Sequence, residues 1–225
     1  MPSKADYWRQ LKIFNPSKHR DIKIAMIGAG SVGSFTALVL AKMGLTNITV
    51  WDDDVVENHN IPNQMYPITA IGQKKTSTLF SVLGLMAGGN PLAIVSEKWT
   101  SDTDLDAYDI ILACTDDMTS RKAIWEACKF KPHKTFIDAR MGGEMMLIYT
   151  IDPMSPKQVK GYESTLYDDD KAEDMPCDAR TIVYNMAGIA GFIANNVKKV
   201  LTNDKQLHHE IVFDYKTMLM ETRSW

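Results

Sequence analysis

A glycine turn between an apolar run and a helical pattern constrains the fold of this chain more than any other feature. Gly28, Gly30 and Gly33 form a G-x-G-x-x-G motif. Apolar residues 22–27 precede the motif, and apolar residues recur at helical spacing over 35–43. A strand, a glycine turn and a helix in this order allow the backbone to approach a phosphate group and direct the positive end of the helix at it. The pattern therefore predicts a nucleotide site, but it does not identify the nucleotide.

Strands and helices alternate along the rest of the chain. We expect helices near 74–86, 119–129 and 181–201, and strands at 48–51, 92–95, 110–114, 135–138, 145–151 and, as a pair, through 211–222. This alternation predicts an α/β fold with a Rossmann-like, doubly wound and mostly parallel sheet, an antiparallel extension, and ligands at the carboxyl ends of the strands. We expect one domain over residues 1–225, because the chain can bury a full core and shows no repeat or linker. The Pro-, Gly-, Tyr- and Asp-rich stretch at about 154–180 predicts a long crossover loop that acts as a lid or binding segment.

Composition excludes several classes of protein. A net charge of -3 with 24% charged residues shows no global bias toward nucleic acid or anionic membranes. No apolar stretch reaches the roughly 20 residues of a membrane helix, and the first residues lack the apolar region of a secretory signal. The three cysteines form no C-x-x-C pair, which argues against a disulfide framework or a cysteine-based zinc site. We expect a cytoplasmic protein without a nucleic-acid or membrane partner.

Three carboxylates follow the second predicted strand, at residues 52–54. Asp52 ends this strand, at about the place where an acid binds a ribose hydroxyl in such folds. A solvated turn is the alternative interpretation. It accounts well for Asp53 but leaves the glycine motif unexplained.

Further motifs follow the glycine turn in a fixed order. They are D-x-D-x-V-x-x-x-N-I-x-x-Q at 52–64, G-x-x-K at 72–75, N-P at 90–91 and T-D-x-x-x-x-R at 115–121. This ordered set resembles the ubiquitin-activating-enzyme superfamily of ThiF, MoeB and HesA proteins. The resemblance extends from Tyr7 to about Leu201 and is dense from Ile22 to Arg121.

The resemblance implies an adenylyltransferase. Such an enzyme binds ATP and magnesium, adenylates the C-terminal carboxylate of a small ubiquitin-like or sulfur-carrier protein or peptide, and releases pyrophosphate. Cations and hydrogen-bond donors are needed because a carboxylate must attack an anionic α-phosphate. The implied roles are Asp52 for the ribose, Asp54, Asn60 and Gln64 for the nucleotide pocket, Lys75 for the phosphates and Asp116 for magnesium.

Each of these residue assignments has a structural alternative. Lys75 can be one of two solvated lysines at a helix start. Asp116 can cap the helix that we expect near Thr119. Arg121 can brace a carboxylate in the site or lie along the helix surface.

Two positions bear on how positive charge is supplied to the phosphates: an arginine near the N-terminus, and a position where the family's usual arginine is absent. Residues 7–10 resemble the family's Y-x-R-Q motif, which implies that Arg9 reaches the ATP site of the partner in a homodimer; a surface arginine is the alternative. Asn63 stands where the family usually has arginine, and losing that cation weakens catalysis if nothing replaces it. Arg140 can compensate, or it can form a salt bridge.

A cysteine late in the predicted loop is a candidate nucleophile. Cys177 lies before the helix expected from residue 181, and some family members carry a thioester- or persulfide-forming cysteine in this loop. Asp174 and Asp178 disfavour its thiolate, and an incidental thiol is the alternative. Cys114 and Cys128 fit core positions.

Two other functions compete with adenylation. A pseudoenzyme that retains the fold for binding is consistent with Asn63. An NAD-dependent oxidoreductase shares the fold and Asp52, but it does not explain Asn60, Gln64, Lys75 and Asp116 together.

Overall fold

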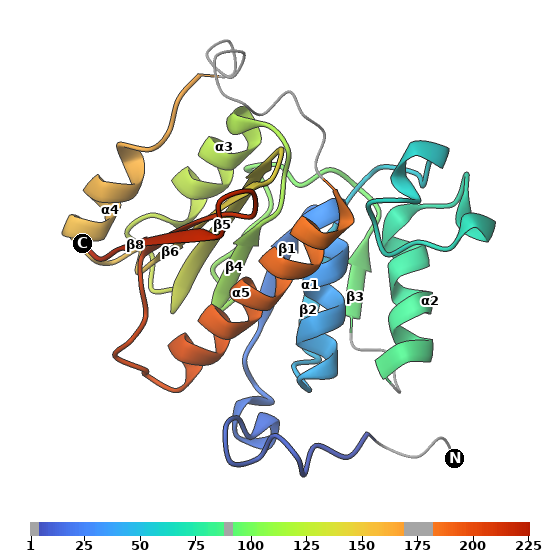
Figure 1. Ribbon diagram of the computed structural model, residues 1–225, viewed down its shortest axis with the longest axis horizontal. Helices are drawn as coiled ribbons and strands as arrows, with labels where there is room; N and C mark the ends of the chain where they lie inside the picture. Colours follow the sequence, from blue (N-terminus) through green and yellow to red (C-terminus); the bar gives the residue numbers. More distant parts are fainter. Residues whose placement is uncertain (1–4, 88–91, 169–181) are drawn as a thin grey trace.

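An eight-stranded sheet forms the centre of the structure, a computed structural model that describes residues 5–87, 92–168 and 182–225 (Figure 1). The strand order is β3-β2-β1-β4-β5-β6-β7-β8. The strands β1 to β5 pair in parallel, whereas β6, β7 and β8 extend the sheet in antiparallel fashion. The strands are β1 Ile24–Ile27, β2 Ile48–Trp51, β3 Leu92–Val95, β4 Ile110–Ala113, β5 Thr135–Gly142, β6 Met145–Ile151, β7 Glu210–Asp214 and β8 Leu219–Arg223.

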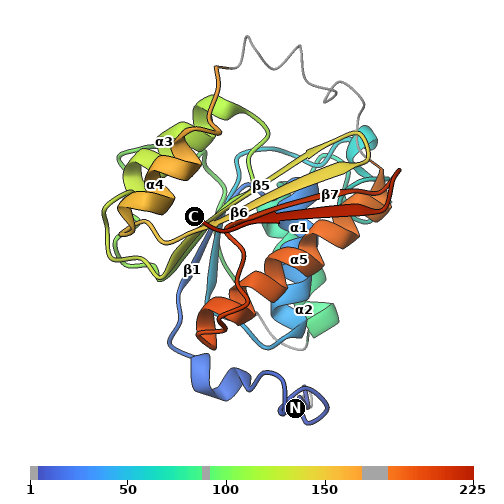
Figure 2. The same cartoon turned by 60° about the vertical axis from the view of Figure 1, so that its left-hand side comes forward.

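Helices cover both faces of this sheet (Figure 2). The helices α1, α2 and α5 lie on one face, and α3 and α4 lie on the other. No helix in the described ranges is long and apolar enough to cross a membrane. The helices are α1 Ser31–Lys42, α2 Lys75–Ala87, α3 Met118–Cys128, α4 Pro156–Glu163 and α5 Val183–Leu201, with short 3-10 helices at Pro16–His19, Asn58–Asn60 and Ile68–Ala70.

The central strands are buried on both faces. Every residue of β1 and β4 is buried, as expected for parallel strands covered by helices on each side. Alternate residues therefore join two different cores: Met26 packs toward α1 and α5, and Ala25 packs toward α3. Because β1, β2 and β4 run parallel, their carboxyl ends meet at one edge of the sheet, where the predicted site residues follow.

The predicted fold class is confirmed, with shifts of a few residues at most element ends. The strand predicted at 135–138 continues to Gly142, and after a turn the chain runs back as β6, which pairs with it. The turn predicted at 88–91 lies outside the described residues.

The prediction of one uninterrupted loop over 154–180 is wrong in its first part. Residues Pro156–Glu163 form helix α4, with a proline in its first turn, where the missing N–H costs no hydrogen bond. Val159 and Tyr162 lie three residues apart, on one face of α4, and both are buried in the core beside α3. These two apolar residues fix the segment as a helix. Residues 169–181 lie outside the described ranges.

Candidate functional site

The glycine turn is packed closely against itself and against the end of β4. Gly28 has φ +100°, and a Cβ at this position would lie 2.5 Å from the carbonyl oxygen of Cys114. A Cβ on Gly33 would lie 2.0 Å from the carbonyl oxygen of Gly28. A Cβ on Gly30, in contrast, would meet no atom within 4 Å. Two glycines are therefore required by packing, and the third borders open space at the start of α1.

The N-terminus of α1 can receive an anion. Gly30 is its N-cap residue and provides no side chain to satisfy the first N–H groups. These groups and the helix dipole favour a phosphate at this end of the helix. The space that a Cβ on Gly30 would occupy at this end of the helix is open.

Asp52 lies beside the turn, as predicted. Its Oδ2 accepts the N–H of Ala29 at 2.7 Å, and its Oδ1 accepts the N–H of Asp54 at 2.9 Å. Burial raises the pKa of Asp52, whereas these hydrogen bonds and the nearby Lys75 ammonium oppose the rise. Each carboxylate oxygen retains a lone pair that can accept a hydrogen bond from a hydroxyl group.

Lys75 is a buried cation, so the interpretation as a solvated residue is wrong. The residue is 6% exposed, and its Nζ lies 2.7 Å from Oδ2 of Asp54, whose side chain is largely exposed. Lys74 is the exposed member of the pair and donates to the carbonyl of Asp53. The structure thus places a buried ammonium and an exposed carboxylate in contact beside Asp52.

In the amide-rich stretch over residues 58–64, one amide side chain stabilises the local backbone and another has an unpaired oxygen. Asn60 is buried, and its Oδ1 accepts the N–H of Glu57 at 2.8 Å in a capping box. Oε1 of Gln64 is buried and has no hydrogen-bond partner within the described part of the chain. Buried acceptors are rarely left unpaired, so Gln64 is suited to accept a donor from a ligand. Asn63 is half-buried.

Two adjacent aspartates after β4 have different roles. The N-cap of α3 is Asp117, whose Oδ1 accepts the N–H of Ser120 at 2.6 Å. The alternative that Asp116 caps this helix is therefore wrong. Asp116 is exposed. In the described ranges no group of three or more His, Cys, Asp or Glu side chains could hold a metal ion alone. A magnesium ion at Asp116 would need phosphate and water oxygens as further ligands, which is its usual arrangement in nucleotide sites.

A carboxylate that the sequence analysis missed organises the neighbouring loop. Asp138, fully buried on β5, accepts a hydrogen bond from Arg121 and another from Nε of Arg140 at 2.7 Å. Burial opposes ionisation of Asp138, but the two guanidinium groups hold its pKa below the usual value. Arg121 also donates to the carbonyl of Thr115. Arg121 therefore braces a carboxylate, as one of the two alternatives predicted.

Arg140 forms a salt bridge and is not available to a ligand. Besides Asp138, it donates to the carbonyl of Thr165 at 2.9 Å, and its guanidinium lies 4.5 Å from the ring centre of Tyr149. The hydroxyl of Tyr162 also donates to Asp138, at 3.0 Å. An aspartate at the end of a predicted strand, two residues before an arginine, is the signal that could have identified this network.

The N-terminal segment that carries Arg9, dark blue in Figure 1, lies at the opposite end of α1 from the glycine turn. Arg9 is exposed and lies over the Trp8 ring at 5.4 Å, in a stretch of turns over residues 8–13. The side chain of Gln10 donates to the carbonyl of Met43, at the C-terminal end of α1. Because α1 has 12 residues, or about 18 Å of helix, Arg9 is remote from the site of its own chain.

The structure describes two of the three cysteines, and both lie in the core. Cys114 and Cys128 are buried, which confirms them as core residues, and burial raises the pKa of each thiol to about 12. Cys177 lies outside the described residues.

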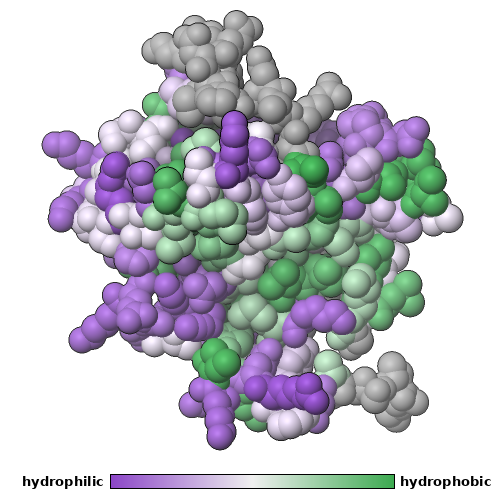
Figure 3. Space-filling model, in the orientation of Figure 1, coloured by the Kyte–Doolittle hydropathy of each residue, from purple (hydrophilic) through white to green (hydrophobic). Residues whose placement is uncertain are grey.

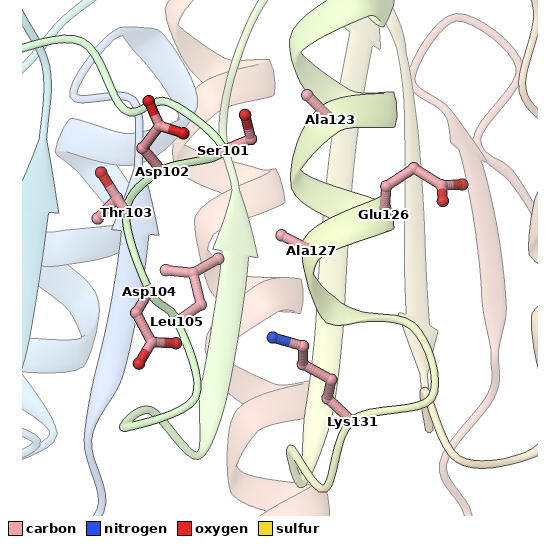
Figure 4. Close-up of a pocket in the computed structure, with 9 residues that line it drawn as sticks. All are labelled: Ser101, Asp102, Thr103, Asp104, Leu105, Ala123, Glu126, Ala127 and Lys131. Atoms are coloured by element: carbon pink, nitrogen blue, oxygen red, sulfur yellow. The ribbon is translucent and has the colours of Figure 1, made fainter.

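A separate surface hollow lies along α3 (Figure 4). Its volume is about 460 Å³. Lys131 in its wall forms an ion pair with Asp106 at 2.6 Å. None of the predicted site residues lines it, so this hollow is distinct from the candidate site. Its lining residues are Ser101, Asp102, Thr103, Asp104, Leu105, Ala123, Glu126, Ala127 and Lys131.

Comparison with known proteins gives a family match over nearly the whole chain. The model of the ThiF family matches residues 7–224. The chain is 26% identical over 177 residues to the sulfur carrier protein ThiS adenylyltransferase of Escherichia coli, covering 76% of this chain and 68% of that protein. It is 23% identical over 217 residues to a probable molybdopterin-synthase adenylyltransferase of Porphyra purpurea, covering 93% and 56%. It is 29% identical over 127 residues to the ATP-dependent ubiquitin transferase-like protein Cap2 of Enterobacter hormaechei, covering 54% and 21%.

Solved structures share the fold. Escherichia coli MccB with AMPCPP and MccA has a TM-score of 0.75 at 17% identity, and the match covers 93% of this chain and 65% of that one. MccB with ATP has a TM-score of 0.73 at 16% identity, with the same coverage. At these identities the likeness shows the fold alone. The chain spans about two thirds of the MccB chain and a fifth to two thirds of the three relatives named above.

The glycine packing yields a stability prediction. Gly33→Ala should lower the free energy of unfolding by about 1–3 kcal/mol, because its Cβ would overlap a backbone carbonyl that cannot move away easily. Gly191→Ala is the matched control: this glycine also lies within a helix, but a Cβ there meets nothing within 4 Å. The control should gain up to about 1 kcal/mol from helix propensity. Urea denaturation measures both, and equal effects would contradict the packing argument.

Proposed function

Because the chain belongs to the ThiF family, whose model matches residues 7–224, we propose that it is an ATP-dependent adenylyltransferase. Its substrate is the C-terminal carboxylate of a small ubiquitin-like or sulfur-carrier protein or of a peptide. The observation that carries the proposal is the grouping of an open helix N-terminus at Gly30, the ribose-type acid Asp52 and the buried cation Lys75 around one edge of the sheet.

The names of relatives support this substrate class. They include adenylyltransferases for the sulfur carrier ThiS and for molybdopterin synthase, and a ubiquitin-like modifier-activating enzyme. The similar fold of MccB is solved with ATP and with MccA. The reaction consumes ATP, so a cytoplasmic location is part of the proposal.

In the proposed reaction each group of the site has a defined task. Asp52 accepts hydrogen bonds from the ribose hydroxyls, and the first N–H groups of α1 donate to phosphate oxygens. The Lys75 ammonium, paired with Asp54 in this structure, shares its charge with the phosphates. Asp116 would hold magnesium, which when bound would offset charge on the phosphates and on the leaving pyrophosphate. The substrate carboxylate can then attack the α-phosphate without full charge repulsion.

A catalytically weakened binding protein of the same fold is the second candidate. Asn63 removes the arginine that the family motif usually supplies, and Arg140 does not replace it because Asp138 and Thr165 engage its guanidinium. ATP–pyrophosphate exchange distinguishes the two, assayed with tailed proteins encoded near the gene. Exchange above background supports the enzyme, and Mg-ATP binding without exchange for any tailed protein supports the second candidate.

The two aspartates after β4 provide the test of the magnesium assignment. Asp116→Ala should weaken Mg-ATP binding at least 10-fold, because a carboxylate would be removed from the bound cation. Asp117→Ala should cost about 1 kcal/mol of stability through loss of the α3 cap and leave magnesium-dependent binding unchanged. Calorimetry with and without magnesium measures both. Unchanged binding by the Asp116 variant would overturn the assignment.

A homodimer with a composite site is part of the proposal. The segment that carries Arg9 lies at the far end of α1 from the glycine turn, so we infer that Arg9 reaches the site of a partner chain. Hydrophobic residues gather over α1, α2 and α5 on the face seen in Figure 3. Leu85 and Met86 of α2 are exposed. Such a surface is suited to contact another subunit.

Mixing two inactive variants tests the composite site. In a dimer of Arg9→Ala and Asp116→Ala chains, one of the two sites has an intact Asp116 and receives an intact Arg9. After random subunit exchange, about a quarter of all sites should be intact, and pyrophosphate exchange should recover to about that fraction of wild type. Exchange of subunits is shown separately with two differently tagged chains. Mixed dimers without recovered activity would contradict a role in trans.

Transfer of the activated group to Cys177 is the last step of the proposed reaction. Adenylation would be followed by attack of the thiolate on the acyl carbon, with AMP as the leaving group. Mass spectrometry after incubation with Mg-ATP and substrate should then show a thiol-labile adduct on Cys177. If Cys177→Ser keeps full turnover and the wild type forms no adduct, the reaction stops at the adenylate.

A further inference from the structure

Tyr66 makes a hydrogen bond to the glycine turn, and this residue has no role in the site proposed above. The residue is 5% exposed, and its hydroxyl donates to the carbonyl oxygen of Ala29, the residue between Gly28 and Gly30. The neighbouring N–H of Met65 donates to Oγ of Ser34 on α1 at 3.1 Å. The stretch before Pro67 is thus attached to both the turn and the helix that follows it.

Two side chains together orient the two peptide groups that flank Ala29. Asp52 accepts the Ala29 N–H, which belongs to the peptide between residues 28 and 29. Tyr66 binds the Ala29 carbonyl, which belongs to the peptide between residues 29 and 30. The backbone between the two glycines therefore has a fixed orientation at both of its peptide groups.

The second of these peptides carries the N–H of Gly30. In a trans peptide the carbonyl and the N–H point in opposite directions, and no cis peptide occurs in the described residues. Holding the Ala29 carbonyl at Tyr66 therefore turns the Gly30 N–H away from Tyr66. No described residue accepts a hydrogen bond from this N–H, and nothing lies within 4 Å of a Cβ built on Gly30.

We propose that Tyr66 is a positioning residue for nucleotide binding: its hydroxyl fixes the Ala29–Gly30 peptide so that the Gly30 N–H is presented to a phosphate oxygen. The proposal rests on the proposed ATP site. Without the hydroxyl, this peptide can rotate, and binding must then supply the cost of ordering it. Tyr66 acts through the backbone and does not itself touch the nucleotide.

The hydroxyl is suited to this task because it remains a donor. Burial raises the pKa of Tyr66 well above its usual value, and the nearby carboxylates of Asp52 and Asp54 raise it further. The phenol is therefore protonated at neutral pH. The opposing explanation is that Tyr66 only fills the core and that its hydroxyl binds the closest carbonyl.

Removing the hydroxyl distinguishes the two explanations. Tyr66→Phe should bind Mg-ATP about 10-fold more weakly than wild type, the effect of about one hydrogen bond to a charged group. Tyr108→Phe is the matched control, because its hydroxyl donates to Oγ1 of Thr49 at 3.1 Å, in the core beside α3. The control should bind Mg-ATP within about twofold of wild type. Calorimetry is carried out below the unfolding temperature of all three proteins.

The amide signal of Gly30 gives a readout that a packing role would not change. In nitrogen-15 spectra of the wild type, Mg-ATP should shift the Gly30 amide proton downfield more than the amide of Gly191, and Tyr66→Phe should reduce that shift. If wild type binds Mg-ATP without this shift, or if Tyr66→Phe binds as tightly as wild type, the inference is overturned. If wild type does not bind Mg-ATP at all, the proposed function fails first. If Tyr66→Phe does not fold, the hydroxyl is needed for the fold itself and the inference is overturned.

Discussion

The close contact between the glycine turn and the end of β4 is the constraint on which the site depends. Gly28 approaches the carbonyl of Cys114, and Gly33 approaches that of Gly28, so closely that no side chain fits at either glycine. This contact fixes the start of α1 relative to β1 and β4. The first N–H groups of the helix consequently lie at the edge of the sheet, and the third glycine leaves room beside them for a ligand.

A second constraint comes from the buried carboxylate of Asp138. Two guanidinium groups and a phenol hydroxyl surround it, so a charge that would be costly alone is fully paired. Through Arg121 this carboxylate is connected to the carbonyl of Thr115, the residue before Asp116. Through Arg140 it is connected to Thr165, after α4. One ion network thus fixes the loop that carries the magnesium candidate and the last described turn before residue 169.

The site charges are distributed so that cations are held in place before any ligand arrives. Lys75 is buried with Asp54 as its counterion, and Arg121 and Arg140 share Asp138. The side chain of Asp54 is 64% exposed, whereas Asp138 is fully buried. Lys75 is therefore the cation whose partner is most easily replaced by phosphate, since the exposed carboxylate of Asp54 returns to water when it is released, whereas Asp138 cannot. The two arginines have a structural role, because their removal would leave a buried charge unpaired.

The sequence by itself determined the parallel sheet and the edge at which the glycine turn, Asp52 and Lys75 lie together. Apolar runs, glycine spacing and ordered motifs are local signals, and they are sufficient to place Gly28, Asp52 and Lys75 at one edge of the sheet. Only the tertiary structure decided which charges pair, because pairing depends on residues distant in sequence: Arg121 lies 17 positions from Asp138, and Tyr66 lies 37 from Ala29. The helix α4 was not predicted because only two of its residues are buried, which is too few for a recognisable amphipathic pattern. Its helical conformation depends on packing against the core beside α3.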